Sequence, residues 1–383
     1  MFSQALSKEV RLRADEITDN VNTLYIGGGT PSVLPLSVFE ELLKTLGECG
    51  HCGPFEEFTV EVNPEDIVEK GPEYVEGLLR LGVNRISMGV QSFDDGILRW
   101  MNRRHDSAAA RKAYHILEEA GVPNISIDLI FGLLQLSDTQ WNETLDKALG
   151  ISSKGALPQH ISSYQLSVEP GSALASLVDR GEWEEASEEL CARQYAILCD
   201  RLREAGYHHY EISNFAQPGY EAVHNSAYWS HVPYVGLGPG AHSFLNAIDD
   251  RCVEVAFSHP RVGGGAQLCW EETIGTHCRD AFKATRQWNE GNLGLYLKAG
   301  ETGDFSIVKG KEELTEGQLV MEHIMLGLRT SAGLPETYLQ ANCDPHSLQQ
   351  ALASGHLVRK DDGNLRIPES CFFISDSIIA SLI

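Results

Sequence analysis

A glycine-rich turn and several polar side chains after predicted strands are the residues of this chain best suited to bind a ligand. The run Thr23–Pro31 (TLYIGGGTP) ends in three glycines and a Thr-Pro pair. Adjacent glycines allow φ > 0 and leave backbone N–H and C=O groups open to a charged head group, although a plain tight turn is also compatible with them. Other polar residues follow the later strands: Glu61, Asn63, Gln91, Ser92, Asp128, Tyr164, Gln165 and Glu211.

The elements that must position these side chains are strands and helices that alternate from residue 23 to about residue 215. This alternation predicts βαβ units around a parallel sheet. In a (β/α) barrel the ligand binds at the carboxyl ends of the strands. Capping of the following helix explains any one of these polar residues but explains all of them together poorly. The predicted strands are Thr23–Ile26, Phe58–Val62, Arg85–Val90, Ile125–Phe131, His160–Leu166 and His208–Ile212, and the predicted helices are Val38–Leu46, Tyr74–Leu81, Ala108–Ala120, Trp141–Leu149 and Leu190–Ala205.

Composition excludes several classes of function. The chain has 383 residues and a formal net charge of -24, which argues against nucleic acid and against an anionic lipid surface as the main partner. No apolar stretch is long enough for a transmembrane span, and the charged residues within 1–22 indicate an amphipathic helix rather than a signal peptide. The nine scattered cysteines are typical of reduced thiols, so we expect a cytoplasmic protein.

The pattern changes after Glu211. Residues 213–245 are rich in Gly, Pro and aromatic residues, and residues 246–285 show no clear period. From residue 286 to 383 we expect a smaller, mainly helical unit, with a helix at Leu319–Leu328 and a hairpin within Gly355–Pro368. The predicted organisation is therefore a unit over 1–245, an insertion of unknown role over 246–285, and a carboxyl-terminal unit over 286–383.

Five ordered motifs connect the chain with a known family. They are GGGTPS at 27–32, EVNP at 61–64, RISMGVQSF at 85–93, NRRH at 102–105 and IDLIFG at 127–132. Together they resemble the radical S-adenosylmethionine (SAM) family of oxygen-independent coproporphyrinogen III oxidases and the related HemW haem chaperones. The resemblance covers most of residues 1–245 and resumes at Arg286–Asn289 and Leu319–Thr330. It implies a (β/α) barrel.

The resemblance also implies a set of ligand contacts. Gly28, Gly29 and Thr30 would contact the methionine end of SAM. Carboxylates suit its ammonium, sulfonium and ribose groups, and an arginine suits its carboxylate. A helix cap, a buried ion pair or a solvated basic turn is the structural alternative for these residues. The rest of the pocket would be lined by Glu61, Gln91, Arg103 and Asp128.

A second motif, HNSAYW at 224–229, resembles the HNxxYW signature of the HemW branch, and Gly236–Ser243 also fits that branch. The resemblance implies that His224 contacts haem, since a neutral imidazole can ligate the iron. Tyr228 and Trp229 would offer a flat surface to the porphyrin, or would serve equally in a core. A hydrogen-bonded structural histidine is the alternative for His224.

The chain departs from the family in its cysteines. Relatives carry C-x3-C-x2-C before the GGGTP turn to hold a [4Fe–4S] cluster, whereas residues 1–22 contain no cysteine. Cys49 and Cys52 form the one C-x2-C pair, and we interpret them as a loop pair. Cys269 and Cys278, with His259 and His277, show no ligand spacing. We therefore expect a partial barrel that lacks its first strand, has an open edge beside Thr23–Ile26, and holds no metal site.

Three functions are compatible with these patterns. The first is a haem chaperone that binds haem and SAM and delivers haem to haem-accepting proteins. The second is an oxygen-independent coproporphyrinogen III dehydrogenase, and the third is a non-catalytic haem-binding module. Without cluster ligands, the chain as given is expected to lack radical activity. The segment Gly132–Asp138 departs from the GLPGQT of relatives, which alters the rim of the expected pocket.

Overall fold

A curled seven-stranded sheet forms the centre of the computed structural model, which describes residues 1–17, 21–51, 53–248, 282–306 and 309–383. The strand order is β1-β2-β3-β4-β5-β7-β6, and the first five strands run parallel. The predicted partial barrel is confirmed, and so are its predicted strands. The strands are β1 (Thr23–Ile26), β2 (Glu57–Val62), β3 (Arg85–Gln91), β4 (Asn124–Phe131), β5 (His160–Gln165), β6 (His208–Glu211) and β7 (Asn214–Ala216).

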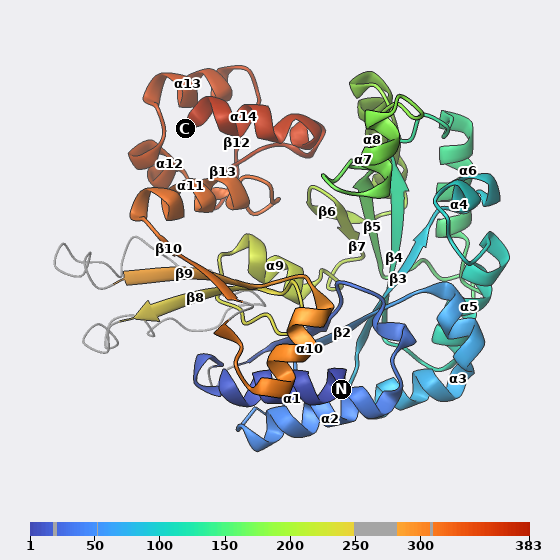
Figure 1. The fold of residues 1–383 in the computed structure, drawn as a ribbon. Coiled ribbons are helices and arrows are strands. Elements are labelled where there is room, and N and C mark those ends of the chain that lie inside the picture. The colour runs from blue at the N-terminus through green and yellow to red at the C-terminus, as the bar shows by residue number, and fades with distance from the viewer. Residues whose placement is uncertain (18–20, 52, 249–281, 307–308) are drawn as a thin grey trace.

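The predicted helices are confirmed as well, and they cover the outer face of the sheet (Figure 1). Side-chain caps fix several of their starts: Ser137 and Gln140 form a capping box on α6, and Asp106 and Ser187 cap α5 and α8. The predicted helix Tyr74–Leu81 is the second half of a longer element that is kinked at Gly71. The helices are α1 (Phe2–Leu12), α2 (Leu36–Glu48), α3 (Pro64–Arg80), α4 (Asp95–Trp100), α5 (Ser107–Glu119), α6 (Asp138–Leu149), α7 (Ala173–Asp179) and α8 (Glu188–Glu204).

The two faces of the sheet differ in chemistry. Parallel strands are usually apolar on both faces. Here alternate residues form an apolar core against the helices, for example Val60, Ile86 and Ile127, which are all fully buried. The residues between them are polar. Since successive side chains of a strand point to opposite faces, the inner face carries Thr59, Glu61, Arg85, Ser87, Gln91, Ser126, Asp128, His160 and Ser162.

At its far edge the sheet departs from the predicted parallel arrangement, because it contains a strand that was not predicted. The short strand β7 lies between β5 and β6 and pairs antiparallel with both. Its three residues, Asn214–Ala216, are too few to show a period in the sequence. At the other edge, β1 is flanked by α9 (Val223–Trp229), whose His224 lies 2.8 Å from Thr23 through Nδ1 and Oγ1. The predicted open edge is thus covered in part.

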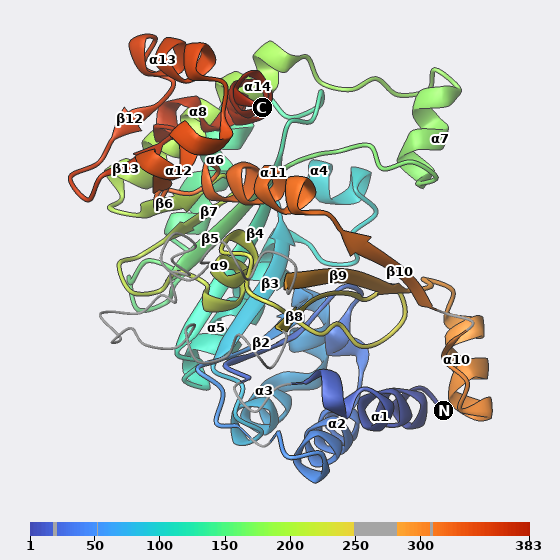
Figure 2. The same cartoon turned by 90° about the vertical axis from the view of Figure 1, so that its left-hand side faces the viewer.

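The rest of the chain builds a second sheet and a group of short helices on the inner side of the barrel (Figures 1 and 2). Strand β9 (Phe282–Asn289) pairs antiparallel with β8 (His242–Ile248) and β10 (Lys309–Leu314), so one sheet spans the predicted boundaries at 245 and 285. The predicted insertion lies mostly outside the described residues. The remaining elements are α10 (Leu293–Thr302), α11 (Glu316–Gly327), β11 (Leu334–Pro335), α12 (Glu336–Asn342), α13 (Pro345–Ala353), β12 (Val358–Arg359), β13 (Asn364–Arg366) and α14 (Ser375–Leu382).

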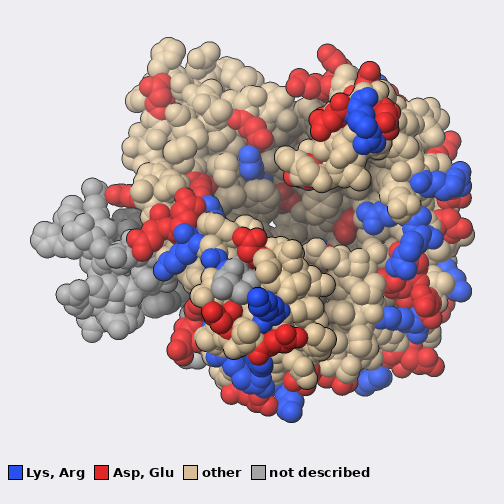
Figure 3. Space-filling view, in the orientation of Figure 1, with Lys and Arg blue, Asp and Glu red and all other residues tan. Residues whose placement is uncertain are grey.

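The predicted helix at Leu319–Leu328 corresponds to α11, and the predicted hairpin corresponds to β12 and β13. Between this carboxyl-terminal group and the barrel the surface is hollowed, and acidic side chains are visible inside the hollow (Figure 3). Within the described residues, no helix is long and apolar enough to cross a membrane.

A buried polar network ties the first helix to the second sheet. Glu9 is fully buried and accepts hydrogen bonds from Tyr296 Oη at 2.6 Å, Asn289 Nδ2 at 2.7 Å and the Gly238 N–H at 2.9 Å. Arg13, which is 2% exposed, pairs with Glu9 at 3.4 Å and donates to the Gly236 carbonyl oxygen. These bonds join segments more than 200 residues apart in sequence, and they fix the Gly236–Ser243 loop against α1.

Candidate functional site

A cavity of about 360 Å³ opens at the carboxyl ends of the parallel strands. Six of the eight predicted site residues line it, and they come from four strands or strand-end loops together with the turn after α4. Gly28 and His224 do not line the cavity, although each contacts a residue that does. The lining residues are Tyr25, Gly29, Thr30, Pro31, Glu61, Val62, Asn63, Arg85, Ser87, Gly89, Gln91, Arg103, Asp128, Ser162, Tyr164 and Asn225.

The glycine-rich turn is built around the Glu61 carboxylate. Glu61 Oε2 accepts the Gly28 N–H at 3.0 Å, and Oε1 accepts the Tyr25 hydroxyl at 2.5 Å. A Cβ atom on Gly27 would lie 2.4 Å from the Tyr25 ring and 2.5 Å from Glu61 Oε1, so a side chain at this position would collide with the pair. Gly28 has φ +86°, which favours glycine. Gly27 is therefore required by the packing of Tyr25 and Glu61, and Gly28 is favoured by its backbone conformation.

Gln91 and Arg103 form another wall. Gln91 ends β3 with φ +68°, an uncommon conformation for a residue with a side chain, and it follows a bulge in the pairing of β3 with β4. Burial lowers the pKa of Arg103, which is half-buried. No carboxylate of the described residues lies within 4.0 Å of its guanidinium. Arg103 therefore presents its positive charge to the cavity.

Asp128 provides the second carboxylate. The Ser87 hydroxyl lies 3.0 Å from both carboxylate oxygens, and the Ser126 hydroxyl lies 3.4 Å from Oδ1. Burial deep in the barrel raises the pKa of Asp128 to about 6, against the opposing effects of the Ser87 hydrogen bond and of nearby Arg85. Asp128 is thus ionised at neutral pH but close to its titration range.

The sequence prediction missed several lining residues. Arg85, Ser87 and Ser162 lie within strands rather than at their ends, and Tyr25 precedes the glycines. Their signal was the alternation of polar and apolar residues within the strands, because a polar residue at every second position predicts a polar inner face. Asn225 arrives from α9, far along the chain, and no local pattern places it there.

His224 lies beside the cavity, behind Tyr25. Its ring stacks on the Tyr25 ring with centroids 4.9 Å apart, and its two nitrogens contact Thr23 Oγ1 and, at 3.0 Å, Tyr228 Oη. Glu57 accepts its backbone N–H at 3.1 Å at the start of α9. Burial lowers the pKa of His224, which keeps the ring neutral. Both ring nitrogens of His224 are engaged, so ligation of an iron requires that one of these two contacts is broken. The contact with Tyr228 is the more accessible one, because Tyr228 is exposed.

The described residues do not fit an iron–sulfur cluster. No group of three or more His, Cys, Asp or Glu residues in the described ranges could hold a metal ion. Among the described cysteines, Cys49 follows α2, Cys191 and Cys199 both lie on α8, Cys343 follows α12 and Cys371 lies just before α14, so three of them do not converge on one place. The predicted pair partner Cys52, together with Cys269 and Cys278, lies outside the described residues. We therefore derive no chemical step through a cluster, and the expected lack of radical activity stays a prediction.

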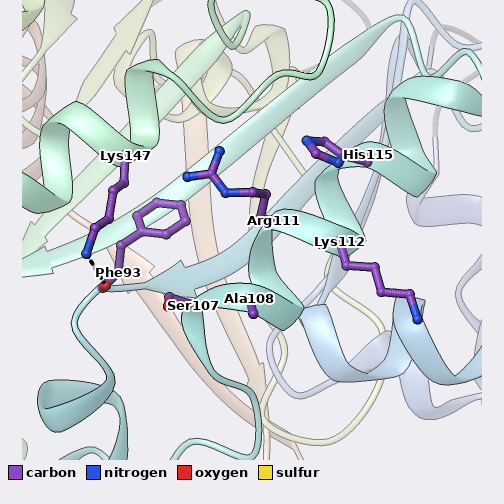
Figure 4. A pocket seen from close by; sticks show the side chains of 7 residues that line it. All are labelled: Phe93, Ser107, Ala108, Arg111, Lys112, His115 and Lys147. Carbon is purple, nitrogen blue, oxygen red and sulfur yellow. Dashed lines mark hydrogen bonds between the residues drawn. The ribbon is translucent and has the colours of Figure 1, made fainter.

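A second cavity, of about 410 Å³, lies in the groove between α5 and α6 and contains none of the predicted residues (Figure 4). Arg111 and Lys147 lie on either side of the Phe93 ring, whereas Lys112 points away. Arg111 donates to the Gly150 carbonyl oxygen at 3.0 Å, and Lys147 donates to the Phe93 carbonyl oxygen at 3.1 Å. These bonds hold neighbouring loops to the helices, so the cations have a structural role.

The strand-end cavity combines carboxylates with cations. Glu61 and Asp128 can attract a positively charged group, and Arg103 can pair with a carboxylate. Tyr25 and Tyr164 add aromatic surface, and Asn63 and Gln91 offer amide groups to hydroxyls or a base. This donor set suits a zwitterionic ligand that carries an additional positive charge.

Comparison with known proteins gives a consistent result. A model of the radical SAM superfamily matches residues 6–148. The haem chaperone HemW of Synechocystis sp. is 33% identical over 258 residues, which cover 67% of this chain and 59% of that protein. HemW of Lactococcus lactis is 37% identical over 230 residues, 60% of this chain and 59% of that protein. The chain thus spans about three fifths of the length of these relatives.

Two further comparisons extend over nearly the whole chain. The mitochondrial radical S-adenosyl methionine domain-containing protein 1 of Danio rerio is 28% identical over 393 residues, which cover 100% of this chain and 80% of that protein. The structure of coproporphyrinogen III oxidase (HemN) from Escherichia coli matches 99% of this chain and 82% of that chain, with a TM-score of 0.73 and 20% identity. At this identity the likeness shows the fold. By its sequence motifs and its barrel, the chain belongs to the radical SAM superfamily as a HemW-type protein.

Proposed function

We propose that this protein is a haem chaperone that binds SAM in the strand-end cavity, binds haem beside His224, and transfers haem to haem-accepting proteins. The observation that carries the proposal is the convergence of Gly29, Thr30, Glu61, Gln91, Arg103 and Asp128 on one cavity. These residues were selected from separate motifs, and unrelated structural roles would not bring them together.

The donor set of the cavity supports SAM as the ligand. The sulfonium and ammonium groups of SAM are cations, which the carboxylates of Glu61 and Asp128 would stabilise in a partly desolvated site. Its carboxylate would pair with Arg103. These residues would bind and orient the ligand. Glu61 is suited to this role because the Tyr25 hydroxyl and the Gly28 N–H fix the position of its carboxylate.

The position of His224 supports the haem site. α9 is anchored at its amino end by Glu57, and it presents a neutral imidazole flanked by the Tyr25 and Tyr228 rings. Neutral imidazole ligates haem iron, and aromatic rings pack against a porphyrin. The Synechocystis and Lactococcus relatives carry the name haem chaperone, which favours this function over oxidative decarboxylation of coproporphyrinogen.

Two titrations test the proposal on the chain 1–383. In calorimetry, SAM should bind at least tenfold more tightly than S-adenosylhomocysteine, because the thioether of the latter lacks the sulfonium charge. In absorption spectroscopy, haem should show a shifted Soret band that His224→Ala removes. His346→Ala is the matched control, since His346 is exposed on α13, away from the cavity lining. Equal haem spectra for His224→Ala and the wild type would contradict the haem site.

Delivery is tested separately. Haem-loaded protein should transfer haem to an apo-haem protein faster than free haem equilibrates through buffer, and His224→Ala should abolish the advantage. Formation of protoporphyrinogen from coproporphyrinogen, without haem affinity, would instead support the oxidase.

A further inference from the structure

We infer that Arg85 is a ligand-binding residue: its buried guanidinium, at the deep end of the strand-end cavity, receives a carboxylate of a bound ligand. The inference rests on the proposed function, because it concerns the cavity and the neighbouring His224 site. It adds a second anion-binding position to the one formed by Arg103.

The burial of Arg85 is the first observation. Arg85 is 2% exposed and begins β3, where its side chain extends along the polar inner face of the sheet into the cavity. Its Nε atom is buried without a hydrogen-bond partner among the described residues. No carboxylate oxygen of the described residues lies within 4.0 Å of the guanidinium. A buried cation of this kind is strongly unfavourable unless something pairs with it.

A second buried arginine, Arg13, shows what a structural role looks like. Arg13 is equally buried, at 2% exposure, and it pairs with Glu9 and Glu16 and donates to the Gly236 carbonyl oxygen and the Ser243 hydroxyl. Within the described part of the chain, Arg85 has no such set of ion pairs. A residue that served only to hold the fold together would be expected to resemble Arg13.

The surroundings of Arg85 are arranged for a small anionic group. The Tyr164 hydroxyl lines the same cavity and can donate to a carboxylate, whereas Ser87 and Ser162 already direct their hydroxyl groups at Asp128. Asp128 is an acidic group on the same wall, and it already accepts hydrogen bonds from Ser87 and Ser126. Asp128 offsets the charge of Arg85 only from beyond ion-pair distance, so the guanidinium remains available to a carboxylate of the ligand.

Two carboxylates could occupy this position. SAM carries one on its methionine end, and haem carries two on its propionates. Arg85 lines the cavity proposed for SAM, and His224 of the proposed haem site stacks on Tyr25, which lines the same cavity, so a carboxylate of either ligand can approach Arg85. Its charge also lowers the pKa of Asp128 and that of His224, in each case with a smaller effect than burial has. The shared chemistry is a guanidinium paired with a carboxylate, which is bidentate in its strongest form.

Carboxylate-free ligands distinguish the two sources. On chain 1–383, haem is compared with haem dimethyl ester by absorption titration, and SAM is compared with decarboxylated SAM by calorimetry. Each comparison is repeated with Arg85→Gln, and with Arg111→Gln as the matched control on α5, outside the lining of the strand-end cavity. For the ligand whose carboxylate Arg85 receives, Arg85→Gln should weaken binding about 100-fold. The carboxylate-free form should then bind wild type and Arg85→Gln equally.

The result that overturns the inference is equally clear. The inference is wrong if the wild-type protein binds haem or SAM and Arg85→Gln binds both ligands as tightly as the wild type does. A wild-type chain that binds neither ligand would instead overturn the proposed function. Should Arg85→Gln fail to fold, as judged by circular dichroism, Arg85→Lys replaces it. This variant keeps the charge but not the planar fork, and the expected loss of affinity is about tenfold.

Discussion

The glycine turn allows a sharp test of how the site is built. Gly27 is not in the left-handed region, so its replacement by alanine strains no dihedral angle. The new Cβ atom would instead lie 2.4 Å from Tyr25 Cε1 and 2.5 Å from Glu61 Oε1. Neither neighbour can move freely, because the Tyr25 ring stacks on His224 and hydrogen-bonds to Glu61, which also accepts the Gly28 N–H.

The expected loss of stability in Gly27→Ala follows from the interactions that the new methyl group disrupts. To relieve the contact, the Tyr25–Glu61 hydrogen bond has to break or the β1 backbone has to shift. Loss of a hydrogen bond to a charged group costs about 1.5–3 kcal/mol, and overpacking of a filled site costs about 1–3 kcal/mol. We therefore expect Gly27→Ala to lower the free energy of unfolding by about 2 kcal/mol and to weaken SAM binding, since Glu61 is displaced.

The assay is urea unfolding followed by circular dichroism, with SAM calorimetry on the same samples. Gly29→Ala is the control. No heavy atom lies within 4 Å of the position that a Cβ atom would take at Gly29, and the φ angle of Gly29 is not in the left-handed region. The unfolding midpoint of Gly29→Ala should therefore match that of the wild type. Because Gly29 lines the cavity, SAM affinity should still fall in the control. An unchanged midpoint in Gly27→Ala would refute the tight packing of Glu61 against the turn.

Three further outcomes are expected. Because burial raises the pKa of Asp128 from 3.8 to about 6, the native ligand-free protein binds more protons than the unfolded state between about pH 4 and pH 6, and its stability falls over that window as pH rises. In urea unfolding, Asp128→Asn should therefore stabilise the free protein by about 3 kcal/mol at pH 8 but not below pH 4. In calorimetry, the SAM affinity of the wild type should fall as pH drops through about 6. Tyr228→Phe frees Nε2 of His224, so its haem titration should give an affinity at least equal to that of the wild type, and a large loss would show that the hydroxyl itself binds haem. Glu9→Ala removes one of the two ion pairs of buried Arg13 and leaves the Tyr296 hydroxyl without its acceptor, and it should destabilise the protein by about 3–5 kcal/mol in urea unfolding; a change below about 1 kcal/mol would contradict a structural role for this network.

Much of the barrel could be predicted because its signals are local. Alternating apolar and polar residues, as in Phe58–Val62, mark strands, and glycines such as Gly82 mark helix ends. The site residues at strand ends could also be predicted, since the carboxyl ends of parallel strands meet at one edge. Glu61 and Asp128 lie together in the cavity for that reason.

The parts that escaped prediction depend on pairing over long distances. Strand β7 has only three residues, and β10 reads as a polar segment, KGKEEL, that gains its strand conformation from pairing with β9. The buried residue Arg85 is the first residue of β3, so a prediction based on the carboxyl ends of strands does not include it. Engagement of both His224 nitrogens likewise depends on β1 and α9, which lie about 200 residues apart.

The central claim is that the strand-end cavity binds SAM, and a crystal structure of chain 1–383 grown with saturating SAM tests it most directly. The account predicts SAM in that cavity, in contact with the Gly28–Thr30 turn and with Glu61, and with its carboxylate on an arginine. Clear density for SAM at another place on the protein, or a cavity that stays empty at saturating SAM, would contradict it.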